Sequence, residues 1–166
     1  MLFFILLFNF VNCDPYFDIS SNVTMIESLL NNFELDPNYI STEYDKSLLY
    51  YATEQQYIDT INLLILNNCD LNIYSEADFN YPVIIASTLY DDTILNTMIN
   101  HGANLNVKSK NNTNVLNNVF FAKNINALYN IFDNQYTNVN FDLYLYLITN
   151  NIKYFDDKDI LFVNNF

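Results

Sequence analysis

One segment of this chain occurs three times at a near-constant interval. The clearest copy runs from Tyr81 through an apolar stretch to His101-Gly102-Ala103-Asn104-Leu105-Asn106. A second copy starts 34 positions upstream, at Ser47, and a third starts 33 positions downstream, at Asn114. A period of this length is typical of stacked repeats, whose units bury their apolar faces against their neighbours. We therefore expect a repeat array that presents an extended binding surface and not a catalytic pocket.

The apolar spacing inside each copy predicts two helices. A short helix of small and apolar residues comes first, and a second helix carries an apolar stripe on one face. In the first copy, that stripe consists of Ile58, Ile61, Leu64 and Ile65. Polar segments at about 73–80 and 107–113 separate the copies and are expected to form hairpins. Pro82 fits the first turn of a helix, where its missing N–H costs nothing.

These copies resemble the ankyrin repeat, whose pattern joins Thr-Pro-Leu-His and two alanines to an apolar helix and a closing Gly-Ala-Asp-Val-Asn. Pro82 holds the proline position, Ala86 holds the first alanine and Asn106 closes the unit. The resemblance covers about residues 43–136 and is weakest in the third copy. It implies an all-α solenoid of stacked helix-turn-helix units joined by short hairpin loops.

Several positions depart from the family pattern. The chain has one glycine, whereas ankyrin units normally use glycine after the second helix. Asn68 occupies that position in the first copy and is a plausible left-handed cap, because Asn follows Gly in this preference. Gln135 occupies it in the third copy, so we expect that unit to end irregularly. The family's turn-bracing histidine is replaced by Tyr50, which implies a less tightly packed stack.

The same pattern divides the chain into four parts. They are a signal peptide at 1–13, a degenerate N-terminal repeat or cap at 18–42, ankyrin repeats at 43–140 with units at about 43–75, 76–109 and 110–140, and a C-terminal helical cap or partial repeat at 141–166. Asp36-Pro37-Asn38 is expected to form the turn of the N-terminal repeat.

The first thirteen residues allow two interpretations. The apolar run from Leu2 to Phe8 is too short to span a bilayer and has the length of a signal-peptide core. A signal peptide would direct the protein into the secretory pathway, and cleavage after Cys13 would leave a mature chain that starts at Asp14. The alternative is an apolar helix that caps the solenoid of a cytoplasmic protein. A capping helix needs a polar outer face, so we favour the signal peptide.

Charge and composition limit the classes of partner. The net charge is −13, and the six basic residues form no cluster. Nucleic acid and anionic membranes both need a basic footprint, so neither is expected to bind. A cationic protein partner is allowed, and a solvated acidic surface is the alternative. The excess of Asn, Ile, Tyr and Phe suggests an AT-rich eukaryotic genome.

No catalytic or metal-binding pattern stands out. His101 is the only histidine, and it is expected at a helix end, interacting with terminal carbonyls. Cys69 is expected to be a small buried residue. A single glycine excludes a glycine-rich phosphate loop. We therefore predict no enzyme activity, no cofactor and no metal. Two rivals are an acidic active site around Asp91-Asp92 and a repeat fragment that has no specific partner.

The resemblance implies that a protein partner binds a monomer along the hairpin tips and the concave face of the first helices. Carried over position by position, the predicted contact residues are Glu43, Tyr44, Lys46, Glu54, Gln55, Asp78, Asn80, Thr88, Leu89, Lys110, Asn111, Thr113 and Phe121. The alternative is that these positions are solvated and vary freely.

Overall fold

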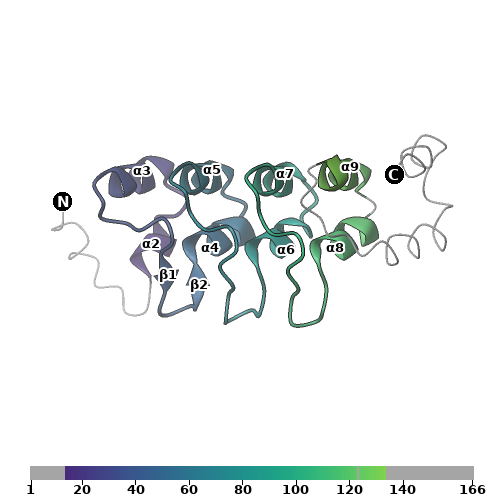
Figure 1. Ribbon diagram of the computed structural model, residues 1–166. Coiled ribbons are helices and arrows are strands. Elements are labelled where there is room, and N and C mark those ends of the chain that lie inside the picture. The colour runs from purple at the N-terminus through teal and green to yellow at the C-terminus, as the bar shows by residue number, and fades with distance from the viewer. Residues whose placement is uncertain (1–13, 123, 134–166) are drawn as a thin grey trace, which may run out of the picture. The chain divides into compact units, whose positions relative to one another are not determined.

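The structure is a computed structural model, and it describes residues 14–122 and 124–133. Short first helices alternate with longer second helices along the chain (Figure 1). The first helices are α2 (Pro15–Asp18), α4 (Leu48–Glu54), α6 (Pro82–Ala86) and α8 (Val115–Phe121). The second helices are α3 (Val23–Asn31), α5 (Ile58–Leu66), α7 (Thr93–Asn100) and α9 (Ile125–Asp133).

The helices lie in two layers. Each first helix packs against the first helix of the next unit, and each second helix does the same in its own layer (Figure 1). Fully buried side chains such as Leu49, Leu64, Val83 and Leu95 fill the space between the layers and between the units. Because each unit shares this core with its neighbours, the stack and not the single unit is the stable structure.

Local sequence fixes where the helices begin. The hydroxyl of Ser47 accepts a hydrogen bond from the Tyr50 backbone N–H at 3.1 Å and so caps α4. Pro82 is the first residue of α6, as predicted. The predicted stripe of α5 is correct for Ile61, Leu64 and Ile65, which are buried, but wrong for Ile58, which is 37 % exposed. Ile58 lies in the first turn of α5, next to the loop that joins it to α4.

Hairpins precede the first helices. Strands β1 (Ile40–Ser41) and β2 (Lys46–Ser47) pair antiparallel, with Ile40 opposite Ser47. The next hairpin is closed by a bridge between Ser75 and Asn80. Neighbouring hairpins also bind each other, since the Lys110 N–H donates to the carbonyl of Phe79 at 3.0 Å. The predicted connecting segments at 73–80 and 107–113 therefore form a continuous edge below the first helices (Figure 1).

A ladder of polar side chains joins the loops that follow the second helices. The carboxylate of Asp70 accepts from the Asn72 N–H at 2.8 Å, and Asn104 does the same for Asn106 at 3.0 Å. Each loop is also tied to the one before it. The Asp70 N–H donates to the Asn38 side chain at 2.6 Å, and the Asn104 N–H donates to the Asn72 side chain at 2.8 Å. These bonds repeat with the sequence period and hold adjacent units in register.

Left-handed backbone ends the second helices at equivalent positions. Asn68 has φ 60°, as predicted for its cap, and Gly102 has φ 83°. Phe33 holds the corresponding place after α3 with φ 58°, although it is 95 % exposed. A bulky residue is disfavoured in this conformation. The stack therefore imposes the same turn on three different side chains.

The N-terminal unit is a helix pair sealed by aromatic rings. Asp14 caps α2 through its side chain and accepts a 2.6 Å hydrogen bond from the Tyr39 hydroxyl. The Phe17 ring stacks on the Tyr51 ring of the next unit with centroids 4.3 Å apart. Helix α2 begins at Pro15, ahead of the predicted range 18–42. The predicted signal peptide at 1–13, Gln135 and the cap predicted at 141–166 lie outside the described residues.

Candidate partner-binding surface

The side chain of Lys46 joins the first two hairpins. Lys46 lies at the end of the first hairpin, Glu54 ends α4 and Asp78 lies in the second hairpin. The Lys46 ammonium is 2.9 Å from Oε2 of Glu54 and 2.6 Å from Oδ2 of Asp78. Burial alone would lower the pKa of Lys46, but the hydrogen bonds to Asp78 and Glu54 outweigh it and raise that pKa. The ammonium is therefore held in its charged form between two units.

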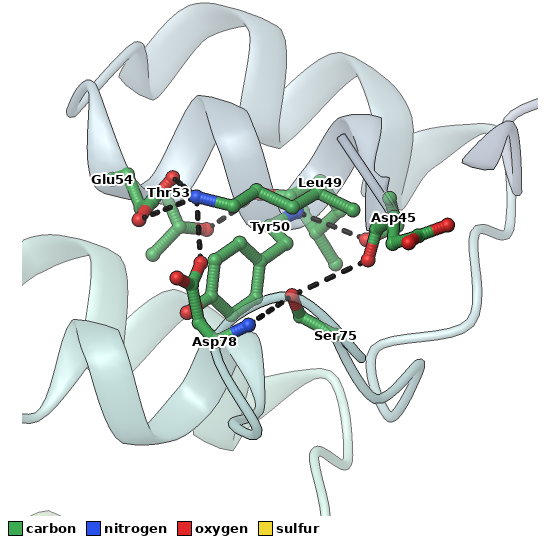
Figure 2. A network of polar contacts seen from close by, with 9 residues as sticks. Asp45, Leu49, Tyr50, Thr53, Glu54, Ser75 and Asp78 are labelled. Carbon is green, nitrogen blue, oxygen red and sulfur yellow. Dashed lines mark hydrogen bonds and ion pairs between the residues drawn. The ribbon is translucent and has the colours of Figure 1, made fainter. Parts of the chain in front are cut away.

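Tyr50 lies beneath this ion-pair network. The Lys46 ammonium is 5.4 Å from the centroid of the Tyr50 ring, and Figure 2 shows the ring next to Asp78. The Tyr50 side chain is fully buried, and its hydroxyl makes no hydrogen bond of ordinary geometry among the described residues. Burial raises the pKa of the Tyr50 phenol, and the charges of Asp78 and Glu54 and a poorly aligned hydrogen bond to Asp78 add to that effect. The phenol therefore stays neutral, and its contact with Asp78 lies outside ordinary hydrogen-bond geometry.

The third hairpin makes its contacts differently. The Lys110 ammonium lies 3.9 Å from the centroid of the Phe79 ring, on the tip of the second hairpin. The Thr113 hydroxyl is 2.6 Å from the Ser109 hydroxyl and closes the third hairpin. Phe79 itself has φ 52° and is 40 % exposed. A cation of the chain thus rests on an aromatic ring that the neighbouring hairpin presents to solvent.

The other predicted contact residues are spread along the same edge and over the ends of the first helices. Tyr44 stacks on Phe17 with ring centroids 5.4 Å apart and keeps 38 % of its surface exposed. The exposed members of the predicted set are Glu43, Tyr44, Gln55, Asp78, Thr88, Lys110, Asn111 and Phe121. The half-buried members are Lys46, Glu54, Asn80, Leu89 and Thr113.

The structure brings only part of this set into direct contact. Lys46, Glu54 and Asp78 share one network, while the Thr88 hydroxyl, in the turn after α6, donates to the carbonyl of Ile85 in that helix. Two acidic residues of the hairpins, Asp45 and Glu76, are missing from the predicted set although both are exposed. Asp45 lies two positions after Glu43, and Glu76 lies two positions before Asp78. This closeness to predicted hairpin residues could have identified both.

The residues considered for catalysis do not form a site among the described residues. Asp91 is exposed and accepts hydrogen bonds from the backbone N–H and the hydroxyl of Thr93, which lower its pKa. His101 lies at the end of α7, with Nδ1 2.8 Å from the carbonyl oxygen of Thr97, as predicted. Cys69 is buried, as predicted, and burial raises the pKa of its thiol to about 12.

The described residues contain neither a metal-binding cluster nor a membrane-spanning helix. No group of three or more His, Cys, Asp or Glu side chains among them is arranged to hold a metal ion. None of their helices has the length and apolar character that a membrane crossing requires.

Comparison with solved structures establishes the fold. The chain is similar to EF0377, an ankyrin repeat protein of known crystal structure, with a TM-score of 0.58 and 18 % sequence identity. The match covers 75 % of this chain and 65 % of that chain, so this chain spans slightly less than two thirds of the solved protein. The predicted all-α ankyrin-repeat fold is confirmed. No family model and no curated protein match the sequence.

Proposed function

We propose that this protein is a non-catalytic interaction module that binds a protein partner through its hairpin tips and the concave face of its first helices. The observation that supports the proposal is the contrast between a repeated scaffold and a variable edge. The ladder from Asn38 to Asn104 repeats in register, while each hairpin presents different exposed side chains. A rigid edge of this kind can recognise a partner without losing much conformational entropy on binding.

A signal peptide at residues 1–13 and action outside the producing cell belong to the same proposal. One contact of the described residues supports it: Asp14 caps α2 with its own side chain. Cleavage after Cys13 would keep this cap, because Asp14 would become the first residue of the mature chain. A cytoplasmic protein that keeps its leader is the alternative.

Crosslinking through the hairpin edge tests the binding role. A photoreactive amino acid is placed at Asn111, which is exposed on the third hairpin, and a control protein carries it at Asn126, which is exposed on α9. Full-length protein expressed in its own cell type is irradiated, and adducts are identified by mass spectrometry. We expect a specific adduct from Asn111 and none from Asn126. Adducts of equal yield from both positions, or none from either, would contradict binding through the hairpins.

The same sample decides the compartment. An N-terminal sequence starting at Asp14, in protein recovered from the secretory pathway or the medium, is expected. A chain that starts at Met1 in the cytosol would contradict the proposed export while leaving the binding role open to the crosslinking result.

A further inference from the structure

The negative charges of the first two hairpins are not balanced by positive charges in the part of the chain that the structure describes. We call the surface made by Glu43, Asp45, Lys46, Glu54, Glu76 and Asp78 the acidic hairpin surface. Lys46 neutralises part of the negative charge of Glu54 and Asp78, and both ion pairs among the described residues involve it. Glu43, Asp45 and Glu76 are exposed and have no ion-pair partner among the described residues. The surface thus carries an excess of negative charge.

Cations of the chain itself show which ligand chemistry this edge accommodates. The Lys46 ammonium is held by two carboxylates above the Tyr50 ring, and the Lys110 ammonium rests on the Phe79 ring. Carboxylates and aromatic faces are the two groups that bind guanidinium most effectively, since it forms forked hydrogen bonds and stacks on rings. An arginine side chain therefore fits this edge better than a lysine does.

The buried hydroxyl of Tyr50 is a second observation at this surface, and it points to a missing ligand. It lies beside Asp78 at the inner end of the surface (Figure 2) and lacks a hydrogen-bond partner of ordinary geometry. A buried polar group without a partner is costly and calls for an explanation. A phenol oxygen also accepts hydrogen bonds, and guanidinium has five N–H donors. A guanidinium in place of the Lys46 ammonium could bond to Asp78, Glu54 and the phenol together.

We infer that the acidic hairpin surface binds an arginine-rich segment of a partner protein, and that Lys46 occupies the partner's cation site in the free protein. This inference rests on the proposed interaction function and names the chemical class of its partner. Lys46 acts as an internal competitor: it keeps Glu54 and Asp78 in place in the free protein and leaves them when a guanidinium arrives. Three acidic residues of this chain lie on the rim of the surface and attract the positively charged segment: Glu43, Asp45 and Glu76. The range of this attraction depends on the ionic strength.

The test measures binding of two labelled peptides to the full-length chain by fluorescence anisotropy. One peptide alternates Arg with Gly, and the other has Glu in place of Arg. We expect the Arg peptide to bind and the Glu peptide not to bind. Asp78→Asn should weaken binding about tenfold, because it removes a charge-assisted contact. Glu34→Gln, a matched change at an exposed acid outside the surface, should alter it less than twofold.

Lys46→Met gives the deciding result. If Lys46 competes with the ligand, removing its ammonium should tighten binding of the Arg peptide about fivefold, the change expected from one exposed ion pair. Lys108→Met is the control, because it removes the same charge from an exposed position on the third hairpin. Equal gains from both variants would reduce the effect to net charge and overturn the assignment of Lys46.

Tyr50→Phe on the Lys46→Met background tests the inner end of the site. We expect it to lose most of the fivefold gain, with circular dichroism confirming that each variant is folded. An unchanged gain would remove the phenol from the site and overturn that assignment. Failure of the Arg peptide to bind, in a protein that still crosslinks a partner at Asn111, would reject the arginine-rich segment while the interaction function stands. If the protein neither binds the Arg peptide nor crosslinks a partner at Asn111, the interaction function itself is wrong.

Discussion

The loops after the second helices and the hairpins before the first helices use the same repeat in opposite ways. In the loops, equivalent side chains make equivalent hydrogen bonds: Asp70 to Asn72 within a unit, and Asn72 to Asn104 between units. In the hairpins, the contacts differ at each step. Lys46 forms ion pairs across the first two hairpins, whereas Lys110 stacks on Phe79 across the next.

This difference separates what holds the stack together from what distinguishes its surface. A hydrogen bond that recurs in successive units fixes their register. It cannot distinguish one unit from another, because the same bond occurs in each. A contact that occurs once does not support the next unit, and it makes its own stretch of surface chemically distinct. The loops should therefore respond to mutation by losing stability, and the hairpins by losing binding.

The largest expected effect is on the loop ladder. Replacing both Asn38 and Asn72 with Ala removes the two acceptors that join successive loops, and we expect roughly 2 kcal/mol of lost stability from two hydrogen bonds. Urea unfolding followed by circular dichroism measures it.

The comparison fails if the hairpins matter equally for stability. Glu43→Ala combined with Glu76→Ala changes two exposed residues of the hairpins and is expected to shift stability by less than about 0.5 kcal/mol. A loss from this pair as large as that from the two asparagines would show that the hairpin edge is structural.

The left-handed caps give a second, smaller effect, whose sign depends on the residue already present. Gly102→Ala should destabilise the protein by about 1 kcal/mol through its backbone alone, since a Cβ there would meet nothing within 4 Å. Phe33→Gly should stabilise it by roughly 0.5 kcal/mol, because relief of the strained φ outweighs the added freedom of the unfolded chain. Both are measured as shifts in urea midpoint.

Asn68→Gly calibrates this series, because Asn tolerates the left-handed region better than Phe and worse than Gly. We expect a change between zero and that of Phe33→Gly. If Phe33→Gly instead destabilises the protein, the exposed ring is making contacts that offset the strain, and the three caps are not equivalent.

The sequence alone predicts well the structural features that recur from one repeat to the next. The period, the position of Pro82 in its helix and the cap at Asn68 all follow from patterns that recur or from single-residue preferences. The left-handed Phe33 could not be predicted, because Phe has no tendency toward that conformation and the neighbouring units impose it. Ile58 was predicted to be buried because it fits the apolar periodicity of α5. Periodicity does not show that the first turn of a helix is more exposed than the turns that follow.

The sequence predicts only part of the ion-pair network between the hairpins. Lys46, Glu54 and Asp78 were each predicted as independent contact residues, and the structure pairs them with one another. Lys46 and Asp78 are 32 positions apart, so their contact depends on how closely two hairpins stack, which no local pattern reveals. Their role in partner binding remains a prediction.

Two phenols, the half-buried Tyr39 and the buried Tyr50, allow the finest test of the difference between a well-formed and a poorly formed hydrogen bond. Tyr39 donates a 2.6 Å hydrogen bond to Asp14, whereas the Tyr50 hydroxyl has no partner of ordinary geometry among the described residues. Tyr39→Phe should therefore cost about 1 kcal/mol of stability at pH 7, and Tyr50→Phe should cost nothing or stabilise the protein by up to about 1 kcal/mol. A loss for Tyr50→Phe as large as that for Tyr39→Phe would mean that Asp78 already accepts a bond from the Tyr50 hydroxyl.

The fall of stability at alkaline pH tests the contribution of the same two residues. Burial raises the pKa of both phenols above the ordinary value of 10.0, and Asp14 adds to the effect at Tyr39 as Asp78 does at Tyr50. The unfolded chain therefore loses these protons first, so stability is complete below pH 10 and falls as the pH rises above it. Each Phe variant should show a shallower fall than the wild type, and Tyr90→Phe, at a fully exposed position, should show the same fall as the wild type. If Tyr50→Phe does not change the slope, the Tyr50 phenol ionises in the folded state as readily as in the unfolded chain, and the site beside Asp78 is open to solvent.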